Sequence, residues 1–184
     1  MKPITKSTIR KTLLGYRRLL GEEIFHKRNE KLCERLLRAI QKNGSNTIHV
    51  FLSIDRNREP DVSILFPALR DRGCRIVAAR TDFANKSQQH FYLNESTELC
   101  ENKMNIPEPV GAEPADLKDV DLILVPLSAA DKHRNRIGYG GGYYDRLLKN
   151  SNALKVGLCL SPLLDEISQT EEWDVELDQI ITPF

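Results

Sequence analysis

The sequence predicts an α/β fold: a three-layer αβα sandwich with a largely parallel sheet and two N-terminal helices. Three observations lead to this prediction. Up to residue 41 the apolar side chains recur at helical spacing, and from residue 47 onward strand-like segments alternate with helix-like ones. Several late strand-like segments are short, unbroken apolar runs, typical of parallel strands buried on both faces. The length of 184 residues suits one domain, so we expect a single domain over residues 1–184.

The two N-terminal helices are predicted from the spacing of apolar residues. In the first helix these residues are Ile9, Leu13, Tyr16 and Leu20. Thr5 or Ser7 would be its N-cap, and Gly21 would interrupt the pattern. A second helix is expected over residues 22–41, with apolar residues at Phe25, Leu32, Leu36 and Ile40. Gly44 would end it, because glycine adopts the left-handed conformation of a helix C-terminus.

A βαβ unit is predicted next along the chain. Residues 47–53 are rich in β-branched and aromatic side chains, as in a strand. Asp61 can cap a helix that carries Val62, Leu65, Phe66 and Leu69. Gly73 would end that helix before a second strand over residues 74–79.

The second half of the chain begins with a less regular pattern. Residues 80–101 show weak periodicity, with a short strand candidate at 90–93, and the prolines within residues 106–114 predict a loop. The pattern then becomes clear again and predicts strands over residues 121–125, 155–160 and 177–182 and a helix over 143–149.

Composition narrows the class of protein. With 40% hydrophobic and 29% charged residues, the chain resembles globular proteins and not disordered ones. The longest uncharged apolar stretch, residues 122–130, is interrupted by Pro126 and is too short to span a bilayer. The N-terminus lacks the long apolar segment of a secretory signal. We therefore expect a cytoplasmic protein with no membrane partner.

The charges nearly cancel, but they are unevenly distributed. Lys and Arg number 27 against 26 Asp and Glu, a net charge of +1 that argues against a nucleic-acid partner. Residues 1–21 contain basic but no acidic side chains, and beyond Lys155 only acidic ones occur. These ends could be two solvated faces that attract each other, or a basic arm for a phosphate and an acidic tail that helps to hold a metal. Composition alone favours solvated faces.

Cysteine and histidine give no sign of a zinc site. The cysteines at positions 33, 74, 100 and 159 are dispersed, and no CxxC or HxxxH spacing occurs. In a cytoplasmic chain we expect reduced cysteines that act as small buried apolar groups.

The most informative segment is the glycine-rich one between the strand at 121–125 and the helix at 143–149. Its glycines are Gly138, Gly140, Gly141 and Gly142, out of 10 in the chain. Glycine permits positive φ and lets backbone N–H groups approach an anion closely. The segment matches neither GxGxxG nor GxxxxGK[ST]. Taken alone, it is either an anion-binding loop or a tight strand-to-helix connection.

Charged residues beside the glycines favour the anion-binding interpretation. Arg136 and Arg146 flank them, and Asp145 lies at the start of the following helix. Arginine offers planar donors to phosphate oxygens, and one or two carboxylates can hold magnesium whose other ligands are water and phosphate. Together these residues suggest a nucleotide-phosphate site. The structural alternatives are helix capping for Asp145 and core packing for Tyr143 and Tyr144.

Two further segments are ambiguous by themselves. Lys6 and Arg10 are spaced i, i+4, so both project from one helix face and could hold a polyphosphate, although an exposed basic face is the commoner case. Glu59 follows the strand at 47–53 at its carboxyl end, where α/β sheets place ligand groups. It could accept hydrogen bonds from a ligand, or it could simply be solvated.

Several motifs now follow one another in a recognisable order: Lys6-x-x-x-Arg10, Phe51-Leu52-Ser53 before Glu59, Ile106-Pro-Glu-Pro, Val125-Pro126 with Asp131 and Arg136, Gly-Tyr-Gly-Gly-Gly-Tyr-Tyr-Asp-Arg over 138–146, and Trp-Asp-Val around Asp174. They resemble the 5-formyltetrahydrofolate cyclo-ligase family, also called 5,10-methenyltetrahydrofolate synthetases. The resemblance covers essentially the whole chain, and the tyrosine-glycine block is its most specific part.

The resemblance implies sites for ATP, folate and magnesium. The ATP site would comprise Lys6, Ser7, Thr8, Ile9, Arg10, Arg136, Ile137, Gly138, Tyr139, Gly140, Gly141, Gly142, Tyr143 and Tyr144. The folate would contact Leu52, Glu59, Tyr139, Gly140, Gly141, Gly142 and Tyr143. Asp145 would hold magnesium together with Asp174, with Asp178 as the alternative second ligand. Arg136 and Lys6 would stabilise charge on the transferring phosphoryl group, and no side-chain nucleophile is needed.

The chain departs from the family pattern at a few positions. Ala130 stands where the family usually has phenylalanine, and Arg134 stands where it usually has glycine, so the turn before Arg136 could differ. The loop before Glu59 departs in length, which leaves Asp55 and Asp61 as alternatives to that glutamate.

The activity that the resemblance implies is ATP- and Mg²⁺-dependent cyclisation of 5-formyltetrahydrofolate to 5,10-methenyltetrahydrofolate, with release of ADP and phosphate through an iminium phosphate. The expected partners are these small molecules, without nucleic acid, and the expected state is a monomer. Two alternatives stay open: a nucleotide- or folate-binding module without turnover, and another phosphoryl-transfer enzyme on a similar sheet.

Overall fold

A six-stranded sheet forms the centre of the computed structural model, which describes residues 5–85, 87–168 and 170–184. Its strand order is β10-β9-β6-β1-β2-β3. The bounds are β1 Thr47–Val50, β2 Arg75–Asp82, β3 Ser87–Leu93, β6 Leu122–Pro126, β9 Leu154–Leu158 and β10 Gln179–Ile181. All neighbouring strands are parallel except β2 and β3. The prediction of a largely parallel sheet is confirmed.

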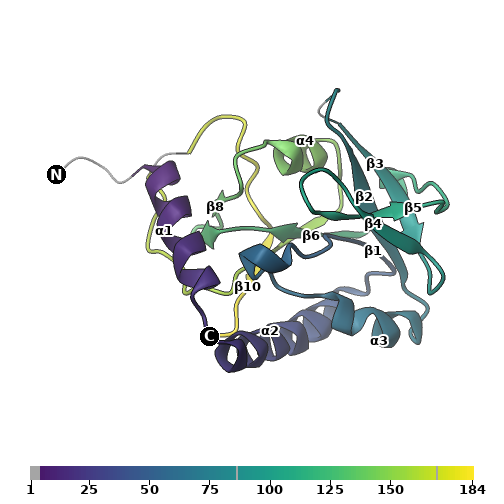
Figure 1. The fold of residues 1–184 in the computed structure, drawn as a ribbon, viewed down its shortest axis with the longest axis horizontal. Helices are drawn as coiled ribbons and strands as arrows, with labels where there is room; N and C mark the ends of the chain where they lie inside the picture. Colours follow the sequence, from purple (N-terminus) through teal and green to yellow (C-terminus); the bar gives the residue numbers. More distant parts are fainter. Residues whose placement is uncertain (1–4, 86, 169) are drawn as a thin grey trace.

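Helices cover both faces of this sheet. They are α1 Lys6–Arg18, α2 Glu22–Asn43, α3 Phe66–Arg70 and α4 Tyr143–Lys149, with 3₁₀ turns η1 Asp55–Asn57, η2 Ser63–Leu65 and η3 Leu117–Asp119. Figure 1 shows α2 and α3 below the sheet and α4 above it, which confirms the three-layer sandwich. In the same view α1 lies to one side, next to a small hairpin of β7 Ala129–Ala130 and β8 Arg136–Ile137.

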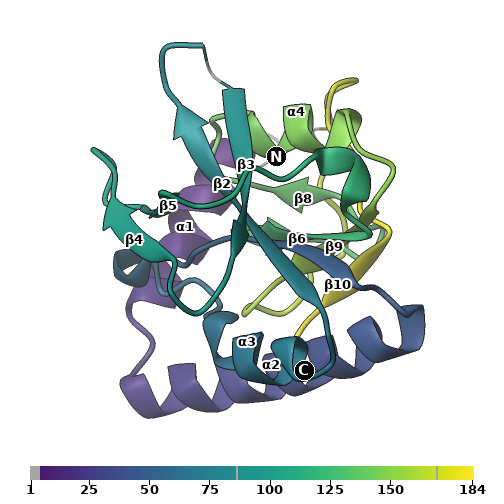
Figure 2. The same ribbon diagram turned by 90° about the vertical axis from the view of Figure 1, so that its right-hand side faces the viewer.

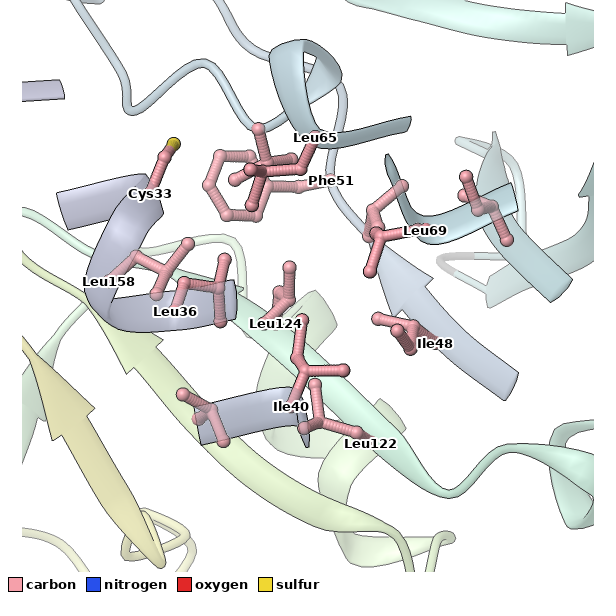
Figure 3. Close-up of a cluster of buried hydrophobic side chains, with 14 of the residues drawn as sticks. Cys33, Leu36, Ile40, Ile48, Phe51, Leu65, Leu69, Leu122, Leu124 and Leu158 are labelled. Atoms are coloured by element: carbon pink, nitrogen blue, oxygen red, sulfur yellow. The ribbon is translucent and has the colours of Figure 1, made fainter. Parts of the chain in front are cut away.

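The apolar side chains of β6 divide between the two layers of the core. Leu122 and Leu124 pack with the α2 side, as Figure 3 shows, whereas Ile123 and Val125 pack with α4 on the other face. All residues of β6 are buried. Each fully buried leucine contributes roughly 1.5–3 kcal/mol relative to its exposed state. This explains the unbroken apolar run that predicted a strand buried on both faces.

The helix ends follow from local signals. Thr5, and not Ser7, is the N-cap of α1, since its side chain accepts a hydrogen bond from the Thr8 N–H at 3.2 Å. Helix α2 ends at Gly44, which has φ of 67°. The expected C-terminal glycine is therefore in the left-handed conformation.

The prediction that residues 106–114 form a loop is wrong for part of this segment. β5, Pro107–Val110, pairs antiparallel with β4, Glu98–Glu101. The prolines at 107 and 109 face Glu101 and Leu99. The Asn102 N–H bonds to the Ile106 carbonyl, so in the alternating antiparallel pattern both prolines fall in pairs that need no N–H donor.

Other elements differ from the prediction in length. The strand expected over residues 47–53 ends at Val50, because the chain then leaves the sheet and the Ser53 hydroxyl bonds to the Pro60 carbonyl. The helix expected after Asp61 is η2 followed by the short α3, since Pro67 in the first turn of α3 lacks the N–H needed to continue a helix. β3 is longer than predicted, and Figure 2 shows β2 and β3 projecting past the rest of the sheet beside β4 and β5. The β7–β8 hairpin was not predicted from the sequence. Within the described residues, no helix combines the length and apolarity that crossing a membrane requires.

Candidate active site

A cleft of about 890 Å³ opens at the carboxyl ends of β1 and β6, where Val50 and Pro126 form part of its wall. This is the edge at which parallel α/β sheets usually bind ligands. Its walls come from α1, the loop after β1, the ends of β2 and β5, the glycine-rich loop, α4 and residues 171–174. Segments that are far apart in sequence thus meet around one cavity.

Most of the residues predicted for the site line this cleft. They are Lys6, Arg10, Leu52, Glu59, Arg136, Ile137, Gly138, Tyr139, Gly140, Gly141, Gly142, Tyr143, Tyr144, Asp145 and Asp174. Ser7, Thr8 and Ile9 are not among the lining residues. Ser7 and Thr8 are exposed, and Ile9 packs against a small apolar cluster of Ala129, Ile137 and Ile167. A helix presents positions i and i+4 on one face, so the residues between Lys6 and Arg10 point elsewhere.

Lys6 and Arg10 of α1 contact two different segments of the cleft wall. Arg10 Nε donates to the Gly138 carbonyl at 2.6 Å, and Lys6 forms an ion pair with Asp174. A Cβ on Gly140, which has φ of 91°, would lie 3.5 Å from the Arg10 guanidinium carbon. The glycine-rich loop and the first helix are therefore in direct contact.

Two more glycines of the loop have separate structural reasons. Gly142 is the N-cap of α4 and has φ of 66°, a left-handed conformation that favours glycine. A Cβ on Gly141 would lie 2.9 Å from Cδ2 of Tyr143, closer than real Cβ contacts allow. The loop is thus a tight strand-to-helix connection that also forms a wall of the cleft.

Arg136 and Asp145 form a nearly buried ion pair within the cleft. Arg136 Nε is also buried, and it has no hydrogen-bond partner among the described residues. A buried unpaired donor is costly, so this atom is a natural partner for the oxygen of an anionic ligand.

Asp174 is the second carboxylate at this end of the cleft. Its Oδ2 accepts from the Glu171 N–H at 2.8 Å as well as from Lys6. Asp178 lies outside the lining and accepts from the Lys155 N–H at 2.7 Å. No cluster of three or more potential metal ligands occurs in the described part of the chain. Asp145 and Asp174 both line the cleft, and a magnesium ion that comes with a nucleotide needs only one or two carboxylates beside phosphate and water.

Glu59 is a buried carboxyl group in the wall of the cleft. It is 3% exposed, and its Oε2 accepts from the Ile54 N–H at 2.8 Å. Burial raises the pKa of Glu59, against the opposing effects of a hydrogen bond with Tyr139, the Ile54 N–H and the charge of Arg17. Of its sequence alternatives, Asp55 is exposed and Asp61 accepts from the Ser63 N–H at 2.9 Å; neither lines the cleft.

Tyrosines and Leu52 give the cleft an apolar surface. Tyr144 packs against both core layers, and burial raises its pKa. The Tyr143 ring lies under the Arg146 guanidinium, 5.1 Å from its centroid. Leu52 packs against the main core from the start of the loop after β1. Core packing and a place in the cleft wall are therefore compatible for Tyr144.

Three residues in or next to the site were not predicted from the sequence: Arg17, Trp173 and Glu108. Arg17 is 2% exposed and bonds to Tyr139, and it follows Lys6 by 11 positions, about three helical turns, so the two share a face. Trp173 lines the cleft although it is 65% exposed. Glu108 is buried and accepts from the Thr81 N–H at 2.8 Å. Of these three residues, only Arg17 could have been predicted from spacing, because it lies on the same helix face as Lys6.

Two of the departures from the family pattern, Ala130 and Arg134, fall in the β7–β8 hairpin. Arg134 has φ of 69°, so arginine here adopts the left-handed conformation that glycine favours. Its side chain also pairs with Glu176 at 2.7 Å. Ala130 is fully buried in the core. The turn before Arg136 thus keeps a glycine-like backbone without a glycine.

Comparison with known proteins gives one consistent result. The model of the 5-formyltetrahydrofolate cyclo-ligase family matches residues 3–183. A 5-formyltetrahydrofolate cyclo-ligase from Escherichia coli K12 is 30% identical over 177 residues, which cover 91% of this chain and 94% of that protein. One from Mycolicibacterium smegmatis is 29% identical and covers 100% of this chain and 96% of that protein.

Solved structures are similar over nearly the whole chain. The 5,10-methenyltetrahydrofolate synthetase from Aquifex aeolicus has a TM-score of 0.84 at 30% identity, covering 98% of this chain and 90% of that one. The corresponding synthetase from Mycoplasma pneumoniae has a TM-score of 0.74 at 23% identity, covering 98% and 100%. The second likeness concerns the fold alone.

Proposed function

The chain belongs to the 5-formyltetrahydrofolate cyclo-ligase family, and we propose that it converts 5-formyltetrahydrofolate to 5,10-methenyltetrahydrofolate with ATP and magnesium, releasing ADP and phosphate. The observation that carries this proposal is the shared cleft. This one cleft contains Lys6, Arg10 and Arg136 beside a glycine-rich loop, and it also contains the buried acceptor Glu59. We take residues 1–184 as one catalytic domain that acts as a monomer.

The reaction has a chemical difficulty that phosphate transfer removes. Ring closure of N10 onto the N5-formyl carbon must expel the formyl oxygen, which is a poor leaving group. Transfer of the γ-phosphoryl group to that oxygen gives an iminium phosphate and ADP. N10 then attacks the carbon, its proton is lost, and the C–O bond breaks with release of phosphate. No step needs a side-chain nucleophile.

The protein's contribution to this chemistry would be positioning and charge neutralisation. Lys6, Arg10 and Arg136 would bind phosphate oxygens, and the unpaired Nε of Arg136 supports this role. Backbone N–H groups of the glycine-rich loop would add further donors. Ser7, Thr8 and Ile9 would act as the helical spacer that sets Lys6 and Arg10 one turn apart. Asp145 and Asp174 would hold the magnesium ion that comes with ATP and that supplies further neutralisation of phosphoryl charge.

The folate would occupy the end that contains Glu59. Its carboxylate would accept hydrogen bonds from N–H groups of the pterin, and Leu52, Tyr139 and Tyr143 would supply the apolar wall that a flat heterocycle needs. The γ-phosphoryl group and the formyl group would then meet at the glycine-rich loop, residues 138–142, which contacts Arg10 and carries Tyr139, a hydrogen-bonding neighbour of Glu59.

The test is an absorbance assay for methenyl-folate with ATP, Mg²⁺ and 5-formyltetrahydrofolate, each omitted in turn. We expect product only when all three are present. We also expect Asp145→Ala to lower kcat/KM by at least about 100-fold while the far-UV spectrum stays native. Asp165→Ala is the matched control, because this exposed aspartate pairs with Lys132 outside the cleft.

The assay separates the proposal from its rivals. Hydrolysis of ATP without folate would favour another phosphoryl-transfer enzyme. Binding of both ligands without turnover would indicate a binding module. Wild-type turnover in Asp145→Ala would show that this carboxylate holds no essential metal.

A further inference from the structure

Arg17 is a buried cation that the proposed chemistry does not use. Its side chain is 2% exposed and does not line the cleft. It donates from Nε to the Asn57 carbonyl at 2.7 Å and from Nη1 to the Leu127 carbonyl at 3.0 Å. From Nη2 it donates to the Tyr139 hydroxyl at 2.6 Å. One guanidinium thus joins α1, the loop after β1, the end of β6 and the glycine-rich loop.

Burying a guanidinium is expensive unless its charge is compensated. Within the described residues Arg17 forms no ion pair with a carboxylate, and it satisfies its donors with oxygens that are formally neutral. Its charge acts on the carboxyl group of Glu59, which shares Tyr139 as a hydrogen-bonding neighbour. Hydrogen bonds therefore connect Arg17 in the interior, through Tyr139, to Glu59 in the cleft wall.

We propose that Arg17 is a positioning residue for the folate part of the cleft: it fixes Tyr139 and the loop that carries Glu59, and its positive charge favours the anionic form of Glu59, which accepts hydrogen bonds. This inference rests on the proposed function, because it assigns Glu59 to folate binding. It adds a residue that contacts neither ligand.

The loop before Glu59 needs such support. Arg58 has φ of 46°, a left-handed conformation that is unfavourable for a residue with a Cβ. Asn57, just before it, is buried and is held from both sides. Arg17 binds its carbonyl, and Arg18 donates to its side-chain oxygen from Nε at 3.2 Å and from Nη2 at 2.5 Å. The end of α1 thereby fixes the loop two residues before Glu59.

The charge balance around Glu59 supports the second half of the proposal. Burial is the largest influence and raises its pKa, and the charge of Asp55 acts in the same direction. A hydrogen bond with Tyr139, the Ile54 N–H and the charge of Arg17 lower it. Tyr144 also faces Glu59, and the carboxylate helps to raise the pKa of that phenol. Removing Arg17 would therefore raise the pKa of Glu59 further.

The experiment compares four variants with the wild-type protein: Arg17→Met, Arg17→Lys, Tyr139→Phe and Asp55→Asn. Initial rates give kcat and KM for 5-formyltetrahydrofolate between about pH 5 and pH 9, at saturating ATP and Mg²⁺. Calorimetry gives the affinity for the folate over the same range. Thermal unfolding and far-UV spectra identify the variants that fold.

We expect Arg17→Met to raise the KM for folate about tenfold or more, because hydrogen bonds to a charged group are lost. The pH below which its kcat/KM falls, the acid limb of the profile, moves to a higher value. Arg17→Lys keeps the charge, so its limb stays near that of the wild type although its KM rises. Tyr139→Phe moves the limb upward and the surface variant Asp55→Asn moves it downward, since it removes a negative charge near Glu59. A purely structural role would not shift the limb in opposite directions.

Unchanged limbs in a folded Arg17→Met protein would overturn the proposal. If that variant does not fold, Arg17→Lys decides: a raised KM for folate with an unmoved acid limb supports the proposal, and an unchanged KM or a limb that moves to higher pH contradicts it. If the wild-type protein binds folate without turning it over, the proposed function fails, while the pH dependence of folate affinity in the same variants still tests Arg17. The two failures are thus distinguishable.

Discussion

At the scale of single residues, glycines occupy positions with very different amounts of space. A Cβ on Gly157 in β9 would lie 2.5 Å from Leu177 Cδ1 and 2.8 Å from Leu127 Cδ2. A Cβ on Gly15 in α1 would meet nothing within 4 Å, apart from its own helix and chain neighbours. The same substitution should therefore have opposite effects at these two positions.

We predict that Gly157→Ala lowers the free energy of unfolding by about 1–3 kcal/mol through overpacking. Gly15→Ala should raise it by about 0.5–1 kcal/mol, because alanine has the higher helix propensity and no side chain is displaced. Urea denaturation of both variants measures the difference. A Gly157→Ala protein as stable as the wild type would mean that Leu177 and Leu127 can move aside without cost.

His49 is a second residue whose surroundings dictate a measurable property. It is fully buried in β1, and its Nε2 lies 3.1 Å from Nδ1 of His90. Burial, and to a smaller degree His90, lower the pKa of His49 from 6.5 to about 3. Burial also lowers the pKa of His90. The folded protein thus keeps His49 neutral at a pH where the unfolded chain binds a proton.

Because the unfolded chain binds more protons below pH 6.5, stability should fall as the pH drops from 6.5 toward 3. At pH 5 His49 alone should cost about 2 kcal/mol. Replacing it by glutamine removes this titration, so the stability of His49→Gln should change less between pH 7 and pH 5. Denaturant titrations at several pH values test this, and equal pH slopes in the two proteins would refute it.

At the scale of elements, the sequence predicted the helix bounds that depend on neighbouring residues. The helix over 143–149 has the bounds of α4, and the helix over 22–41 differs from α2 only at its C-terminal end. Their limits depend on nearby glycines and on apolar spacing. β5 was missed because its prolines are tolerated only in one register against β4, and the β7–β8 hairpin was missed because its strands are too short for a periodic pattern. Pairing between strands is a tertiary property.

The same division holds for the candidate site. The i, i+4 spacing of Lys6 and Arg10 was enough to predict that both cations lie on one helix face. The glycine cluster was enough to predict either an anion-binding loop or a tight strand-to-helix connection. Burial of Arg17 depends on the loop after β1 folding back against α1, which no local pattern encodes. The exclusion of Ser7, Thr8 and Ile9 from the cleft follows from helix geometry once α1 is placed beside it.

The loop around Trp173 makes a prediction of its own. Trp173 is the only tryptophan in the sequence, it is 65% exposed, and it lines the cleft next to Asp174. Nucleotide binding should therefore change its environment. We predict that a non-hydrolysable ATP analogue with Mg²⁺ shifts or quenches the tryptophan fluorescence.

Trp173→Phe is the control for this measurement, since it should abolish the signal while calorimetry still detects binding. An unchanged wild-type spectrum at nucleotide concentrations that calorimetry shows to be saturating would place the bound nucleotide away from the 171–174 loop.

At the scale of the whole molecule, the charge asymmetry has a structural consequence. The basic N-terminal end meets the acidic C-terminal end through the ion pair of Lys6 and Asp174, at the mouth of the cleft. A partly exposed pair of this kind contributes little to stability. Its value is positional, because it brings the start of α1 and the loop around Trp173 to the same cavity. The two charged ends thus attract each other, and they do so at the candidate site. Binding of a phosphate and a metal by these ends stays a prediction.

Helix α1 makes fewer apolar contacts with the rest of the molecule than α2 does. Leu32, Leu36 and Ile40 of α2 belong to the main core, whereas Ile9 and Leu13 of α1 pack only against the small cluster of Ala129, Ile137 and Ile167. Elements with few buried apolar contacts open locally at a lower free energy than the core does. In the free protein α1 should therefore exchange its amide protons faster than α2.

Ligand binding should reverse much of this difference. A bound phosphate chain would tie Lys6 and Arg10 to the glycine-rich loop, so opening of α1 would require release of the ligand and become less favourable by RT ln(1 + [L]/Kd). At about 100 Kd of the ATP analogue this is about 2.7 kcal/mol, or roughly a hundredfold slower exchange. We predict such protection in α1 and little change in α2, measured by hydrogen exchange with mass spectrometry. Lys6→Ala with Arg10→Ala should remove the protection of α1. Equal protection of both helices would mean that α1 opens only when the whole protein unfolds, so that the cleft is closed by the global fold and not by the ligand.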